Sequence, residues 1–132
     1  MDRGSVPTAI RVLVVEPAGD DALDLASQLA GDDAKLVVTT ASGAESARKT
    51  LGSERVDCVV CLHDPPAVDG VEVLGALRGA EPELPVLFAT ELEHVDDVIP
   101  EGPTDVLQVA DGKIHRGVAT HRIESIVSQN YE

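Results

Sequence analysis

Short apolar runs and helical stripes alternate along the whole chain. The runs are rich in valine and are bounded by proline, glycine or acidic residues, which is typical of buried parallel strands. They cover Val12–Val15, Leu36–Thr39, Cys58–Leu62, Val86–Ala89 and Val106–Val109. The repeated alternation predicts one parallel sheet with helices on both faces.

The segments between the runs carry apolar residues at helical spacing. These stripes consist of Ala22, Leu25, Ala26 and Leu29; of Ala44, Ala47 and Leu51; of Gly70, Val73, Leu74 and Leu77; of Val95, Val98 and Ile99; and of Ala119, Ile123, Ile126 and Val127. Asp69 is placed to cap the third helix. A chain of 132 residues suffices for one domain, and we expect it over residues 10–132. Residues 1–9 precede the first predicted strand and are expected to form a flexible tail.

Ligands of such sheets bind beyond the carboxyl ends of the strands. Glu16, the segment Leu62–Pro66, Thr90 and the residues after Val109 follow predicted strands. These positions are therefore where a functional site is expected.

The stretch VDCVVCLHDPPAVDGVEVLGALR resembles the third strand and third helix of response-regulator receiver domains. In that family a proline and a glycine follow the end of the strand at fixed spacing, and Pro66 and Gly70 match them. The stretches RVLVVEP, VVTTASGAESA, LPVLFAT and TDVLQV resemble the other strand regions, so the similarity spans residues 10–130. It implies a flavodoxin-like, doubly wound domain with strand order 2-1-3-4-5, and the acidity is similar to that of receivers from halophilic archaea.

The resemblance also implies a chemistry, most of whose residues are replaced. Family members carry a phosphoaccepting aspartate at the end of the third strand, and this position falls on Leu62. In the family, two acidic residues after the first strand help to hold a divalent cation. Their positions are occupied here by Glu16 and Pro17, so one of the two carboxylates remains. Leucine has no nucleophilic atom, so phosphorylation at this position is excluded.

The remaining family positions lie on the last two strands. The threonine that contacts the phosphoryl group is kept as Thr90. The lysine position falls on Val109, and the aromatic position in the fifth strand falls on Val106. We therefore expect no catalytic residue, no enzyme activity and no metal ligand set; Glu16, Asp64 and Thr90 form a residual pocket.

Each residual residue also has a simpler interpretation. Glu16 can be a solvated acid at a strand end, Thr90 a strand former that bonds the next turn, and Asp64 a loop cap. An alternative function uses Asp64 as a displaced phosphoacceptor or as a cation sensor with Mg²⁺. No cofactor is expected under the main interpretation.

Charge narrows the choice of partners. The formal net charge is −14, from 24 acidic against 10 basic residues. Because the acids are dispersed and not concentrated in a tail, adaptation to high salt is favoured over an acidic protein that recruits basic partners. Such a surface repels phosphates, so no direct nucleic-acid binding is expected.

Cysteines and targeting signals give no further chemistry. Cys58 and Cys61 lie three residues apart in a predicted strand, so they face opposite sides about 10 Å apart and can share neither a metal nor a disulfide. The four histidines are scattered and receive no site role. No signal peptide or membrane-spanning stretch is expected, which predicts a cytoplasmic protein.

The sequence thus predicts a degenerate receiver of two-component signalling that works as a phosphorylation-independent protein-interaction module. Its expected partner is a protein such as a histidine kinase, a regulator or a sensor domain, and a homodimer stays open. A second alternative is a structural or dimerisation domain of a larger signalling protein.

Overall fold

The computed structural model describes residues 9–16, 25–30, 36–63, 70–81, 83–91, 104–110 and 113–130, and these contain five strands and four helices. In chain order they are β1 (Ile10–Val15), α1 (Leu25–Ala30), β2 (Leu36–Ala41), α2 (Ala44–Ser53), β3 (Cys58–Leu62), α3 (Gly70–Ala80), β4 (Val86–Glu91), β5 (Thr104–Val109) and α4 (Arg116–Asn130). All five predicted strands are confirmed. The expected helix around Val95, Val98 and Ile99, the Asp69 cap, Ala22 and the first eight residues of the expected tail over residues 1–9 lie outside the described residues.

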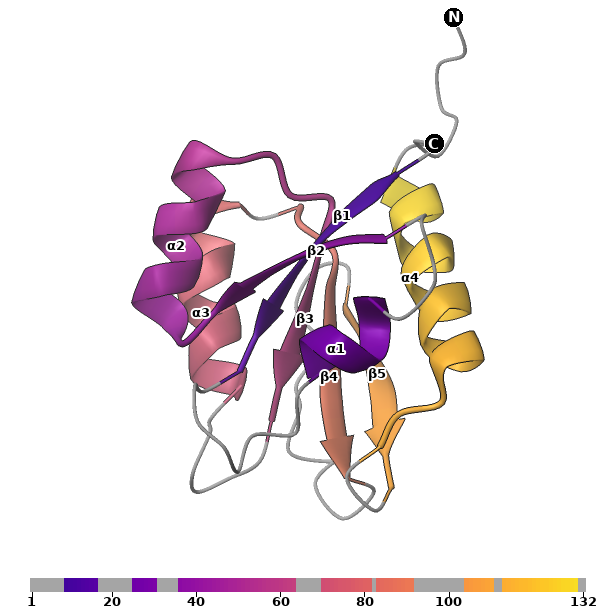
Figure 1. Cartoon of the computed structure of the whole chain (residues 1–132). Helices are drawn as coiled ribbons and strands as arrows, with labels where there is room; N and C mark the ends of the chain where they lie inside the picture. Colours follow the sequence, from indigo (N-terminus) through magenta and orange to yellow (C-terminus); the bar gives the residue numbers. More distant parts are fainter. Residues whose placement is uncertain are drawn as a thin grey trace, which may run out of the picture.

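The strands form one parallel sheet in the order β2-β1-β3-β4-β5, which confirms the predicted topology (Figure 1). β3 is the central strand and pairs with β1 through Val12 and Cys58 and with β4 through Val59 and Val86. Every residue of β3 is buried. This explains why the run is apolar throughout instead of alternating with polar residues.

Two cores cover the two faces of the sheet. Cys58, Val60 and Leu62 belong to the cluster that includes residues of α1 and α4, whereas Val59 and Cys61 belong to the cluster with α2 and α3. Figure 1 shows these helix pairs on opposite sides of the sheet.

The two cysteines are free and buried on opposite faces, as predicted. Burial raises the pKa of the Cys58 thiol far above its usual range, and the nearby Asp57 carboxylate raises it further. The Cys58 thiol is therefore neutral; it packs in the core and its Sγ donates a weak hydrogen bond to the carbonyl of Val59 (3.7 Å).

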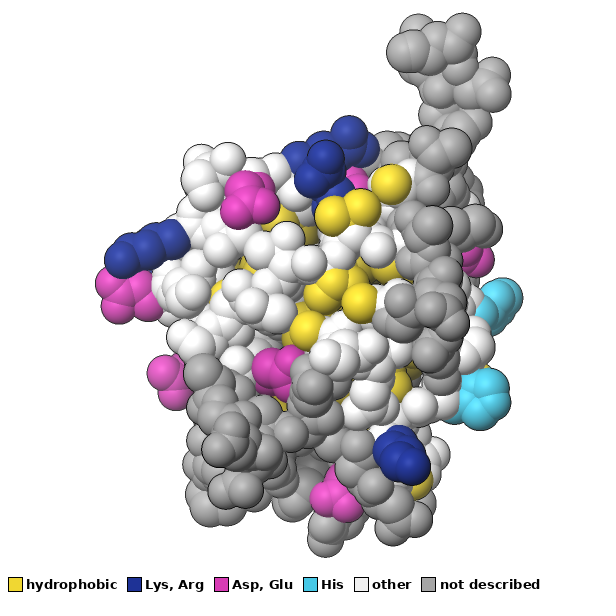
Figure 2. Space-filling model, in the orientation of Figure 1, with side chains coloured by type: hydrophobic (Ala, Val, Ile, Leu, Met, Phe, Trp, Pro, Cys, Tyr) yellow, Lys and Arg dark blue, Asp and Glu magenta, His cyan; other side chains and the backbone are white. Residues whose placement is uncertain are grey.

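Figure 2 shows acidic and basic side chains scattered over this face, some of them side by side, with hydrophobic side chains exposed around β2 and α1. Val37 on β2 is one of the exposed large apolar residues. None of the described helices is long and apolar enough to cross a membrane.

Helix α3 approaches the end of β3 very closely at Gly70. A Cβ atom at this position would lie 3.0 Å from the Leu62 carbonyl oxygen and 3.0 Å from Cδ1 and Cε1 of Phe88. Phe88 is completely buried, and the carbonyl belongs to the central strand. Neither group can move away cheaply, so the contact requires glycine.

We predict that Gly70→Ala destabilises the fold by about 1–3 kcal/mol, because an extra methyl group overpacks this contact. Gly75→Ala on the same helix is the matched control, since a Cβ there meets nothing within 4 Å. The control should be stabilised by about 0.5–1 kcal/mol through helix propensity. Urea denaturation measures both; equal effects of the two substitutions would show that the Gly70 contact is not tight.

Candidate functional site

The ends of the parallel strands meet at one edge of the sheet, here termed the carboxyl edge. Glu16 directly follows β1, Leu62 ends β3, and Val109 ends β5. Leu62 pairs with Ala89, after which Thr90 continues β4. The structure therefore brings Glu16, Leu62, Thr90 and Val109 to the edge at which the sequence predicted a site.

Leu62 fills the centre of this edge with apolar surface. Its exposure is 7%, and it belongs to the same buried cluster as Ala89, Leu107 and Val109. The positions matching the family's phosphoacceptor and lysine thus both contribute to the core. An aliphatic side chain here can neither accept a phosphoryl group nor balance its charge.

Glu16 is a buried helix cap and not the solvated acid that the simpler interpretation predicted. It is 9% exposed, and its Oε1 and Oε2 accept hydrogen bonds from the backbone N–H groups of Leu25 (2.9 Å) and Ala26 (3.1 Å). These are the first amides of α1, where a negative charge is favoured by the helix dipole. The carboxylate therefore fixes α1 against β1.

Among the described residues Thr90 bonds across strands; the turn after β4, to which the simpler interpretation assigned its hydrogen bond, lies outside them. Its side chain is buried, and Oγ1 donates a hydrogen bond to the backbone carbonyl of His63 (2.9 Å). The backbone N–H of His63 in turn donates to the carbonyl of Ala89 (2.9 Å). The hydroxyl is thus committed to holding the ends of β3 and β4 together.

His63 has a structural role that the sequence analysis missed. It is 3% exposed, and its Nδ1 accepts a hydrogen bond from the backbone N–H of Gly70 (3.0 Å) at the start of α3. Its ring packs edge-on against Phe88, with 6.2 Å between centroids. The available signal was strand alternation, which turns the residue after Leu62 toward the α2 and α3 face.

Asp57 was also missed, and it lies at the other end of β3. Its side chain is buried; Oδ2 accepts from the backbone N–H of Arg11 (2.9 Å), and Oδ1 pairs with Nε of Arg55 (3.2 Å). Because Asp57 precedes β3 and Leu62 ends it, this carboxylate is remote from the carboxyl edge. It ties β3 to β1 and gives no substitute phosphoacceptor.

The described residues at the carboxyl edge do not fit a divalent cation. No group of three His, Cys, Asp or Glu side chains comes together within the described ranges. Both oxygens of Glu16 already accept amide hydrogen bonds, and Leu62 offers no ligand atom. Pro17 and Asp64 lie outside the described residues. At the position in β5 where the family carries an aromatic residue, this chain has the half-buried Val106.

The fold and this edge define a receiver-type domain, and comparison with known proteins agrees. Residues 12–108 match the family model of the response regulator receiver domain, so the chain belongs to that family. It is also 35% identical over 99 residues to the transcriptional regulatory protein PrrA of Mycobacterium tuberculosis and of Mycobacterium bovis. The match covers 74% of this chain but 40% of PrrA.

Solved structures show the same fold at lower identity. A putative response regulator from Chloroflexus aurantiacus superposes with a TM-score of 0.73 and 21% identity, covering 91% of this chain and 98% of that one. The signal receiver domain of an HD domain-containing protein from Pseudomonas fluorescens gives 0.72 and 19%, covering 96% and 92%. These structures share the fold, and the family match over residues 12–108 identifies the chain as a receiver domain of two-component signalling.

We predict that Glu16→Ala lowers the unfolding free energy by about 1–2 kcal/mol, because two amides of α1 lose their acceptor. Glu91→Ala is the matched control, since Glu91 is an exposed acid at the same edge of the sheet. The control should change stability little. Chemical denaturation with and without Mg²⁺ checks the role of Glu16. A Mg²⁺-dependent stabilisation of the parent that Glu16→Ala abolishes would show a cation ligand instead.

We predict that Leu62→Asp costs about 2–5 kcal/mol from lost packing and more at neutral pH, where the carboxylate is buried without a cation. Leu62→Asn is the control because it removes the same volume without adding a charge. Burial raises the pKa of the new carboxyl in the folded state, so its extra penalty appears as pH rises above about 4. Denaturation at acid and neutral pH measures the difference; an Asp variant as stable as the parent would contradict the packing of Leu62.

Proposed function

We propose that this receiver domain is a degenerate, phosphorylation-independent protein-interaction module. It works in the cytoplasm, without enzyme activity of its own, by binding a protein partner of a two-component pathway. A histidine kinase, a regulator or a sensor domain is the expected class of partner.

The observation that carries the proposal is Leu62. The position matching the phosphoacceptor is aliphatic, 7% exposed and part of the core. An acyl phosphate needs a carboxylate with open space on its outer side for the phosphoryl group and its cation. A leucine buried in the same apolar cluster as Ala89 and Val109 provides neither the atom nor the space.

The surrounding polar groups support the same conclusion. Glu16 already binds two amides of α1, and the Thr90 hydroxyl binds the carbonyl of His63. To contact a phosphoryl group or its cation, Glu16 and Thr90 would have to break their hydrogen bonds to buried backbone groups. Breaking these bonds costs free energy unless new partners replace the lost ones. The proposal therefore assigns signalling to partner binding at the surface and not to a covalent change at this edge.

The proposal predicts that incubation with acetyl phosphate and Mg²⁺ leaves the intact mass of the protein unchanged. A receiver domain with aspartate at the acceptor position, treated in parallel, shows that the reagent is active. Mass spectrometry under conditions that preserve acyl phosphates makes the measurement.

A hydroxylamine-labile phosphate on this chain would overturn phosphorylation independence. The variant Asp64→Asn then locates it: loss of the phosphate in this variant would establish Asp64 as a displaced acceptor.

A further inference from the structure

The start of α3 is held by the ring of His63. Nδ1 of this ring accepts a hydrogen bond from the backbone N–H of Gly70 (3.0 Å), the first residue of the helix. A ring nitrogen that accepts a hydrogen bond carries no proton, so the imidazole is neutral and has its proton on Nε2. The bond is therefore made only by the unprotonated form of the ring.

Neither partner of this bond can move aside. The backbone N–H and carbonyl of His63 both bond to β4, and its ring is buried edge-on against Phe88. Gly70 is packed so closely that a Cβ atom would lie 3.0 Å from Phe88 and from the Leu62 carbonyl oxygen. A protonated ring would set one N–H against another inside the core, which removes a hydrogen bond and buries a charge.

The ionisable groups on the elements around His63 are acids. Glu16 follows β1, but its two oxygens bond amides of α1, on the other face of the sheet. The acids in the first turns of α2 and α3 and at the end of β4 are exposed, namely Glu45, Glu72 and Glu91. Asp64 and Asp69 lie outside the described residues. At Nδ1 a proton therefore meets a backbone donor and not a carboxylate.

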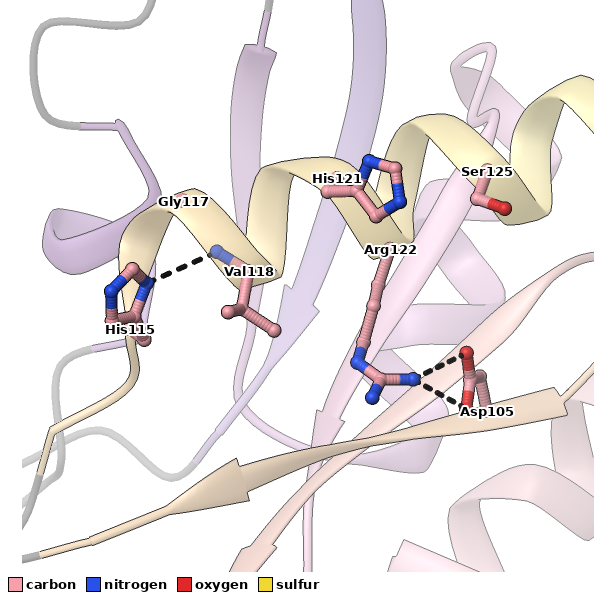
Figure 3. A pocket seen from close by; sticks show the side chains of 7 residues that line it. All are labelled: Asp105, His115, Gly117, Val118, His121, Arg122 and Ser125. Carbon is pink, nitrogen blue, oxygen red and sulfur yellow. Dashed lines mark hydrogen bonds and ion pairs between the residues drawn. The ribbon is translucent and has the colours of Figure 1, made fainter.

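The start of α4 repeats this chemistry with His115 (Figure 3). Nδ1 of His115 accepts from the backbone N–H of Val118 (3.2 Å), and its carbonyl accepts from the N–H of Ala119 (2.9 Å), so this residue caps the helix. A Cβ atom at Gly117 would lie 3.2 Å from Cε1 of the ring, so glycine leaves room for the imidazole over the first turn. Protonation removes the cap and adds a positive charge at the positive end of the helix dipole.

The charged and titratable groups that line the hollow beside His115 are mostly basic. They are Asp105, Lys113, His121 and Arg122. Asp105, the one acid among them, is bonded by Nη1 of Arg122 at 3.1 and 3.2 Å (Figure 3). Its charge is therefore already offset, and the neighbouring cations disfavour a further positive charge on His115.

We propose that His63 and His115 are acid-sensitive latches: protonation at Nδ1 releases the first turn of α3 and of α4 while the sheet stays formed. An imidazole in water takes up a proton at about pH 6.5. Because a released ring binds a proton that the closed latch excludes, the released state gains population as pH falls. The closed helix starts are therefore stable above this pH and lose stability below it. This response needs no covalent change and goes beyond partner binding.

The test is hydrogen exchange measured by NMR on the isotope-labelled chain at fixed salt, between about pH 7.5 and about pH 5.5, where most carboxylates stay ionised. After correction for the intrinsic pH dependence of exchange, protection of the Gly70 and Val118 amides should fall about tenfold, because release binds one proton. The Ala47 amide of α2 is the internal control. It donates to the carbonyl of Gly43, at a helix start without a side-chain cap, and should keep its protection.

The variants His63→Asn and His115→Asn keep a side-chain oxygen acceptor and remove the titrating ring. Each should abolish the pH response at its own helix and leave that of the other helix in place. His121→Asn, at an exposed position of α4, is the matched control and should leave both responses in place. An Asn variant at position 63 or 115 that keeps its pH response, or a loss of either response in His121→Asn, would overturn the proposal.

Imidazole nitrogen shifts of the parent chain cover the case in which His63→Asn does not fold. They should show an unprotonated Nδ1 in His63 at about pH 7.5 and change together with the loss of protection at Gly70. Protonation of His63 without that loss, or constant protection of Gly70 over the whole range, would each contradict the proposal. The acetyl phosphate experiment is done at a single pH, so the two proposals fail separately.

Discussion

Burial of β3 on both faces is the constraint from which the rest of the domain follows. The strand lies between β1 and β4, and helices cover it on both sides. A side chain in such a strand must be apolar or must find a partner inside the protein, because an unpaired charge there is strongly disfavoured. In this chain β3 is apolar up to its last residue, Leu62, which belongs to one buried cluster with Ala89 and Val109.

Once the end of β3 is apolar, the neighbouring polar groups take on structural tasks. Glu16 holds the start of α1, Thr90 joins β4 to β3, and His63 receives the first amide of α3. Each of these bonds has a backbone group as the partner, so each satisfies a donor or acceptor that burial would otherwise leave without one. The carboxyl edge thus keeps the geometry of a receiver domain while its polar atoms stabilise the fold.

Under the proposed function, a partner protein binds the exterior of the domain and not the strand ends. The core gives the domain its shape, but partner choice depends on where exposed charge and apolar surface coincide. The starts of α3 and α4 depend on the unprotonated rings of His63 and His115. The proposed acid response therefore alters the exterior at these helix starts while the core keeps the sheet in place.

The sequence by itself determined the strands and most of the helices, and it placed Leu62 at the end of the third strand. Periods of two and of 3.6 residues are local properties, so Cys58 and Cys61 could be placed on opposite faces, and Leu62 at a strand end, without coordinates. Only the tertiary structure decided what the polar residues do. Glu16 bonds residues nine and ten positions away, Thr90 one 27 positions away, and Asp57 one 46 positions away. Such partners meet only after the strands have assembled in their order, because neither the periodicity nor the composition of a segment specifies which distant backbone groups will face it.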